Sequence, residues 1–234
     1  MEVVMTHGDY RYRTHRLLSG FSRTAARARP LLVAQYGEQA ASLLIADWRS
    51  RFGAFIPQIP FMGHNSPFLI FLIPDIRHLA LYRALQRRGE TLEGAGQLIF
   101  RISEAEFLAI PALARRLASA LWFSPWFKRR LEKHAIESQK RKYPKGYVLR
   151  FVPGDDRTYD YGIDYIECAV CTFLKDQNAF ELAPYLCAID KIASEAMGWG
   201  LTRTKTIAEG KPACDFRFTR LGHTNVALPS SLVG

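Results

Sequence analysis

The sequence lacks any apolar run long enough to cross a bilayer. A membrane helix needs about 20 consecutive apolar residues, whereas the stretch SPFLIFLIPDIR, residues 66–77, is short and interrupted by proline. The N-terminal residues MEVVMTHGDYRYRTHR contain neither the apolar core nor the small-residue cleavage site of a secretion signal. These absences predict a soluble cytoplasmic protein with no membrane partner.

Cysteine is also scarce. The 234 residues include four cysteines, too few for a disulfide scaffold in a chain of this length, so we expect free thiols in a reducing compartment. The hydrophobic content of 48% is sufficient for a packed core. All four cysteines (Cys168, Cys171, Cys187 and Cys214) lie between Tyr161 and Phe218, which makes this segment the candidate for chemistry.

No nucleic-acid-binding signature accompanies the net charge of +10. Residues 128–145 contain eight Lys and Arg against two Glu, whereas residues 155–215 contain six Lys and Arg against eleven Asp and Glu. The positive charge is therefore concentrated outside the cysteine segment, and we expect no nucleic-acid partner. The basic segment is typical of a solvated helix face, with a phosphate-binding or partner-binding patch as the alternative.

The N-terminal half is expected to be helical. We predict a polar arm at residues 1–22 and a helical region at 23–145, which contains helices at 23–52 (split at Gly37), 75–88, 91–102, 103–121 and 125–143. The proline-rich segment 56–68 interrupts them as an ordered loop. Its tip contains two candidate substrate-binding residues, His64 and Asn65, unless it is a plain connector. His64 has no second metal ligand at a suitable spacing.

The C-terminal half changes to strand patterns. Strands are predicted at 147–154, 163–174, 201–208 and 213–220, with a helix at 181–198 between the second and third. The fold class is therefore α+β, with a helical N-terminal half packed on a C-terminal antiparallel sheet with one inserted helix. Residues 146–220 form the cysteine-bearing region, integrated with 23–145 into one domain, and residues 221–234 form a tail.

Side-chain periodicity predicts which cysteines meet. Strand alternation directs Cys168 and Cys214 into one core and Glu167 to the opposite side, while Cys187 and Asp190 lie one helical turn apart. We therefore hypothesise that three thiols and one carboxylate converge, although buried cysteines can also simply pack. The Cys-x2-Cys spacing is found in zinc sites, but Ala169-Val170 is no turn former, and thiols on a strand diverge. No cofactor is predicted; the alternative is zinc or another divalent metal on Cys168, Cys187, Cys214 and Asp190.

Four blocks, GIDYIEC, ELAPYLCAID, LTRTKTIAEG and ACDFRF, resemble the signature blocks of the L-2-amino-thiazoline-4-carboxylic acid hydrolase family. The resemblance extends from Ile56 to Phe218 and departs at Lys211, where members often have a second glycine. The last block is also similar to the cysteine-containing end of the 4-vinyl-reductase-like ligand-binding domain, so a non-catalytic small-molecule or metal sensor is the alternative. The matched positions are Asp164, Glu167, Cys168, Cys187, Asp190, Arg203, Thr206, Gly210, Cys214 and Asp215.

The resemblance implies a hydrolase that opens a small cyclic amidine at a C–S or C–N bond. Such a reaction needs a nucleophile or activated water, a proton donor for the leaving group and a cation for the carboxylate. The candidate catalytic residues are Cys168 and Asp190, followed by Cys187, Cys214 and Glu167. Arg203 is the carboxylate clamp because its planar fork suits bidentate pairing, and Thr206 joins it as a substrate-binding candidate. The expected partner is a small-molecule substrate, and the sequence leaves open whether the chain also forms a homo-oligomer.

Overall fold

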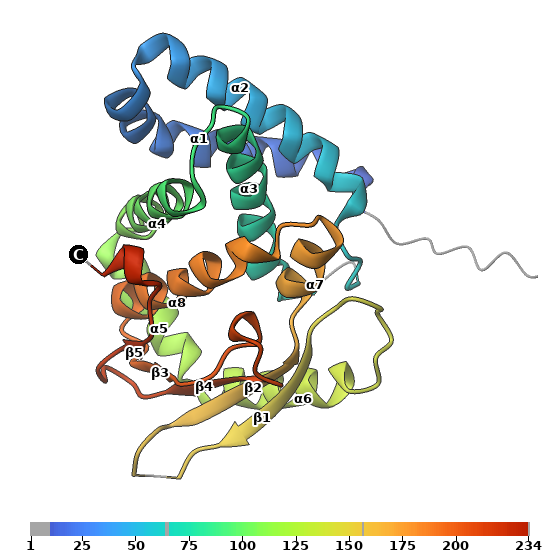
Figure 1. Cartoon of the computed structure of the whole chain (residues 1–234). Helices are drawn as coiled ribbons and strands as arrows, with labels where there is room; N and C mark the ends of the chain where they lie inside the picture. Colours follow the sequence, from blue (N-terminus) through green and yellow to red (C-terminus); the bar gives the residue numbers. More distant parts are fainter. Residues whose placement is uncertain (1–9, 64–65, 156, 234) are drawn as a thin grey trace, which may run out of the picture.

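The structure is a computed structural model that describes residues 10–63, 66–155 and 157–233 (Figure 1). The N-terminal half contains η1 (Arg11–Arg13), α1 (Thr14–Tyr36), α2 (Glu38–Phe55), η2 (Ile56–Gln58), α3 (Leu69–Gln86), α4 (Leu92–Leu108), α5 (Ala112–Trp122) and α6 (Pro125–Ser138). The C-terminal half contains β1 (Val148–Pro153), β2 (Tyr161–Glu167), α7 (Ala169–Asp176), η3 (Phe180–Leu182), α8 (Ala183–Met197), β3 (Leu201–Arg203), η4 (Ile207–Glu209), β4 (Cys214–Phe218), β5 (Asn225–Val226) and η5 (Ser230–Leu232). The predicted α+β class is confirmed.

The sheet is mixed. Its strand order is β1-β2-β4-β3-β5, with antiparallel pairing throughout except between β3 and β5, which are parallel. The predicted antiparallel pairing is confirmed for β1 to β4, whereas residues 221–234, predicted as a tail, contribute the edge strand β5, which pairs parallel to β3. Two helices, α7 and α8, separate β2 from β3, where one was predicted.

Helices cover one face of the sheet. Tyr161 and Ile163 of β2 belong to the same buried cluster as Leu131 and Ala135 of α6. Figure 1 shows α8 lying across the sheet between it and the N-terminal helices. A second, larger cluster joins α1 to α4 with α7 and α8. The helical and cysteine-bearing regions therefore share a core, which fixes the position of α8 over the strands.

Two predicted N-terminal boundaries are wrong. Helix α1 begins at Thr14, so the expected arm 1–22 is helical from there, and Phe21 is buried against Trp48 with ring centroids 4.9 Å apart. Residues 1–9 lie outside the described residues. The predicted helix start at Ser103 is interior to α4, where the Ser103 hydroxyl donates to the carbonyl of Ile99 at 2.9 Å. The predicted split at Gly37, with φ +80°, is confirmed.

The predicted second strand ends early. Strand β2 stops at Glu167, Cys168 is the N-cap residue, and Ala169–Asp176 is the helix α7. A short apolar run does not distinguish a buried strand from a buried helix, and here Ala169, Phe173 and Leu174 are buried at helical spacing. The third predicted strand likewise ends at Arg203. Within the described ranges, no helix is long and apolar enough to cross a membrane.

Candidate active site

A small cavity lies beneath α8 and collects the predicted cysteines. It has a volume of about 100 Å³ and is lined by Cys168 at the start of α7, Cys187 and Asp190 of α8, Arg203 of β3 and Cys214 of β4, among others. Cys187 and Asp190 reach it because they lie one turn apart on the face of α8 that looks toward the sheet. Five predicted site residues thus line one small cavity.

Asp190 and Arg203 form an ion pair at the cavity wall. The Arg203 side chain is 3% exposed, and its Nη1 donates to the Asp190 carboxylate and, at 3.1 Å, to the carbonyl of Cys187. Its Nε and Nη2 have no hydrogen-bond partner among the described residues, so one edge of the guanidinium is available for a second carboxylate. Burial raises the pKa of Asp190 to about 6, against the opposing charge of Arg203.

The thiols are poor nucleophiles at neutral pH as they stand. Burial raises the pKa of Cys187 well above its ordinary value and that of Cys214 to about 11. The hydrogen bond with the Cys171 thiol, together with burial, raises the pKa of Cys168 in the same direction. Because the thiolate is the reactive form, these side chains act as neutral hydrogen-bond donors unless a base removes the proton.

Cys168 and Cys171 do not diverge as predicted. They occupy the N-cap and the first turn of α7, where residues three apart face the same side, and both line the cavity. Residues 163–174 do not form the one predicted strand, because β2 ends at Glu167 and α7 begins at Ala169. Nevertheless, no group of three or more His, Cys, Asp or Glu side chains in the described parts of the chain is arranged to hold a metal ion.

The sequence analysis missed a second carboxylate. Asp75 of α3 also lines the cavity, and burial raises its pKa while nearby His78 opposes the rise. The His78 Nδ1 lies 3.8 Å from the Asp75 carboxylate. Asp75 was interpreted as the polar start of a helix, but α3 begins at Leu69. The available signal was a carboxylate between apolar residues that helical periodicity buries.

Aromatic side chains complete the wall. Trp122 and Trp199 stack with ring centroids 4.4 Å apart and planes 13° from parallel, and Phe216 and Phe218 lie beside them on β4. Both indole Nε1 atoms are buried without a hydrogen-bond partner within the described residues. Such a wall excludes water, strengthens the electrostatic interactions inside the cavity and suits a planar ligand.

The remaining candidates lie elsewhere. Glu167 is outside the cavity and pairs with Arg141 at 2.7 Å on the exposed surface. Thr206 is buried and caps η4, where its hydroxyl accepts from the backbone N–H of Glu209 at 3.1 Å. The predicted positions His64 and Asn65 lie outside the described residues.

A comparison with protein-family models identifies the family. The model of L-2-amino-thiazoline-4-carboxylic acid hydrolase matches residues 76–218, which is more than half of the chain. This chain belongs to the L-2-amino-thiazoline-4-carboxylic acid hydrolase family. Comparisons with curated proteins and with solved structures gave no match. The family match contains every described candidate: the five cavity residues, Glu167 and Thr206. Asp75 immediately precedes it.

Proposed function

We propose that this member of the L-2-amino-thiazoline-4-carboxylic acid hydrolase family hydrolyses a small cyclic amidine such as L-2-amino-thiazoline-4-carboxylate. The observation that carries the proposal is the Asp190–Arg203 pair inside the thiol-lined cavity. A volume of about 100 Å³ suits a small ring and is below the usual range for drug-sized ligands. The free edge of Arg203 would bind the substrate carboxylate in bidentate fashion.

Water activated by Asp190 is the favoured nucleophile. With a pKa of about 6, Asp190 is mostly ionised at pH 7 and is basic enough to accept a proton. The water oxygen bonds to the amidine carbon, and its proton passes through Asp190 to the ring nitrogen. The carbon–sulfur bond then breaks, the new hydroxyl loses its proton to form the carbonyl, and the leaving sulfur is protonated. The product is N-carbamoyl-cysteine.

The protonated thiols suit the second half of this reaction. A neutral Cys168 or Cys187 thiol can donate a hydrogen bond to the sulfur anion that develops as the ring opens. Direct attack by Cys168, the other route, requires Asp190 to deprotonate it first, because the hydrogen bond with the Cys171 thiol and burial raise its pKa. The two routes differ in whether a covalent thiouronium-type intermediate forms on sulfur.

The test is turnover of L-2-amino-thiazoline-4-carboxylate by the purified protein. Ring opening releases one thiol per event, which a thiol reagent detects, and mass spectrometry identifies the product. We expect saturable release that Asp190→Asn reduces by about 10²–10⁴-fold, the usual contribution of a general base. Glu167→Gln is the matched control and should retain activity, since Glu167 lies outside the cavity.

Two outcomes would contradict this assignment. Saturable binding without thiol release would favour a sensor over an enzyme. An equal loss of activity in Asp190→Asn and Glu167→Gln would show that the reaction does not take place in the cavity. If Cys168→Ser retains most activity and the original protein forms no adduct on Cys168, the water route stands over the covalent route.

A further inference from the structure

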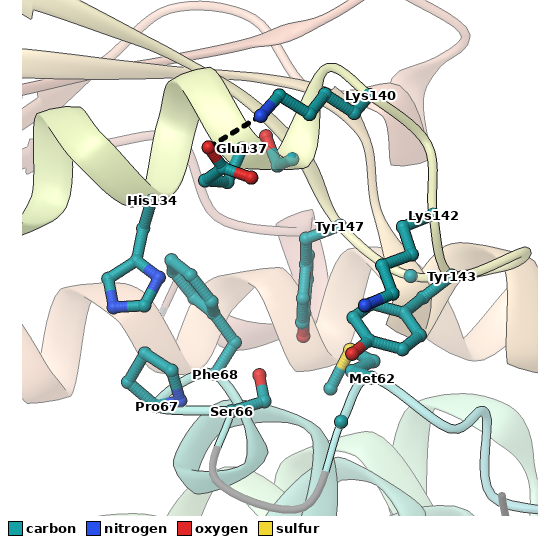
Figure 2. Close-up of a pocket in the computed structure, with 13 residues that line it drawn as sticks. Met62, Ser66, Pro67, Phe68, His134, Glu137, Lys140, Lys142, Tyr143 and Tyr147 are labelled. Atoms are coloured by element: carbon teal, nitrogen blue, oxygen red, sulfur yellow. Dashed lines mark hydrogen bonds and ion pairs between the residues drawn. The ribbon is translucent and has the colours of Figure 1, made fainter.

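A second pocket adjoins the cysteine cavity. It has a volume of about 410 Å³ and is lined by the C-terminal part of α6, the following turn and residues 62–63 and 66–68. Figure 2 shows Phe68, His134, Lys142, Tyr143 and Met62 around this pocket, with Tyr147 among them. Tyr147 lines this outer pocket and also lines the cysteine cavity. Tyr147 is thus the lining residue that the two spaces share.

The Tyr147 ring packs between the aromatic residues of the two sides. Its centroid lies 5.7 Å from that of Phe68, which lines the outer pocket, and 5.8 Å from that of Tyr165, which lines the cavity. Burial raises the pKa of Tyr147 well above its ordinary value. The phenol therefore remains neutral, and its ring can be displaced by rotation without moving a charge.

The rim of the outer pocket has an excess of positive charge. Lys140 pairs with Glu137 at 2.7 Å, whereas Lys142 has no carboxylate partner among the described residues. Burial and the neighbouring Arg130 and Lys133 lower the pKa of His134, which keeps it neutral at pH 7.

Two other cations of the basic segment point away from this rim. Arg141 pairs with Glu167 and Lys145 with Asp176, both at 2.7 Å. In the described part of this turn, Lys142 is thus the cation without a carboxylate partner, and its Nζ lies 5.5 Å from the centroid of the Tyr143 ring.

We propose that the outer pocket is the entrance through which small organic anions reach the cysteine cavity, with the Tyr147 ring as its gate and Lys142 as the residue that favours anions. The basic segment 128–145 then acts by raising the local concentration of a carboxylate before it meets Arg203. The proposal concerns access, so it holds whether or not the cavity catalyses ring opening.

Alkylation of Cys168 tests the gate. Iodoacetamide forms an S–C bond, iodide leaves and the thiol proton goes to solvent; mass spectrometry of peptides gives the rate at each cysteine in the full-length protein at about pH 8.5. Removing the ring in Tyr147→Ala should accelerate the reaction of Cys168 by about tenfold or more, because access limits a buried thiol. Tyr147→Phe, which retains the ring, should react like the original protein.

A larger side chain provides a second test of the gate. Tyr147→Trp should slow alkylation of Cys168, and this variant retains the aromatic packing if Tyr147→Ala does not fold. Thermal unfolding reports on folding, since Cys171 lines the same cavity as Cys168 and is not an independent control. Unchanged rates at Cys168 in both folded variants would overturn the gate and indicate another route into the cavity.

The charge preference has its own measurement. The ratio of the iodoacetate rate to the iodoacetamide rate at Cys168 should fall about three- to tenfold in Lys142→Glu, since two charges change near the entrance. The iodoacetamide rate itself should not change. Arg129→Glu, an equal reversal on α6 outside the pocket, is the control. An equal effect of both reversals, or none from Lys142→Glu, would show that the rim does not select anions.

Discussion

Removal of the Arg203 guanidinium should destabilise the protein far more than removal of an exposed cation. Arg203→Met keeps the aliphatic length but leaves Asp190 and the carbonyl of Cys187 without their donor. Breaking a buried ion pair by deleting one partner costs about 3–5 kcal/mol in the free energy of unfolding. Asp190 is 37% exposed, so its carboxylate retains some hydration, and we expect the lower end, about 3 kcal/mol.

The matched control is Lys145→Met. Lys145 pairs with Asp176 at 2.7 Å, but both side chains are well exposed, and such a pair contributes about 0–1 kcal/mol. Urea unfolding followed by circular dichroism measures both. With an m-value of about 3 kcal/mol/M, the Arg203→Met midpoint should fall by about 1 M and the control by about 0.3 M or less.

The double variant Asp190→Asn with Arg203→Met decides the cause. One explanation for a loss of stability in Arg203→Met is that the Asp190 carboxylate is left without its cation. In that case neutralising Asp190 should restore most of the lost free energy of unfolding, and the double variant should unfold at a higher urea concentration than Arg203→Met alone. Additive losses would refute this reasoning and place the cost in lost packing of Arg203 over the Phe216 ring, 5.4 Å away.

Three further predictions concern pH and packing. The value of kcat/KM should rise with pH through about 6, because Asp190 must lose its proton to act as a base; a profile that is flat between pH 5 and 7 would assign the base elsewhere. Gly96→Ala should destabilise by about 1–3 kcal/mol, since the added Cβ would lie 2.2 Å from the Tyr185 ring between α4 and α8. Gly53→Ala, with nothing within 4 Å, should instead stabilise α2 by about 0.5–1 kcal/mol in the same denaturant series.

The sequence predicted the fold class and the convergence of the thiols on one cavity. For Cys214 the predicted reason is correct, whereas for Cys168 it is not. Cys214 lies on the inward face of β4 as alternation predicts. Cys168 enters the cavity because the chain turns into α7 after Glu167, whereas the argument placed it on a strand. Residues 169–174 are apolar enough for either state, and only contacts with α3 and α8 make the helix the better choice.

Other parts of the site depend on tertiary contacts that no local pattern encodes. Tyr147 precedes β1 and Asp75 lies inside α3, yet both border the cysteines. Neither residue is near a cysteine in the sequence, so only the tertiary packing, in which α3 contacts α7 and β1 contacts α6, reveals them. The edge strand β5 is two residues long and has no alternating pattern to detect.

That short strand bears on how the protein tolerates truncation. β5 pairs with β3 through Thr202–Asn225 and Arg203–Val226, so it covers what would otherwise be an open sheet edge. Beyond it, the carbonyl of Ser231 accepts from the Gln97 side chain at 2.7 Å, which ties the last residues to α4. A chain shortened after residue 220 would expose the β3 backbone, and unpaired edges recruit strands from other molecules. We expect such a product to aggregate although every cavity residue remains.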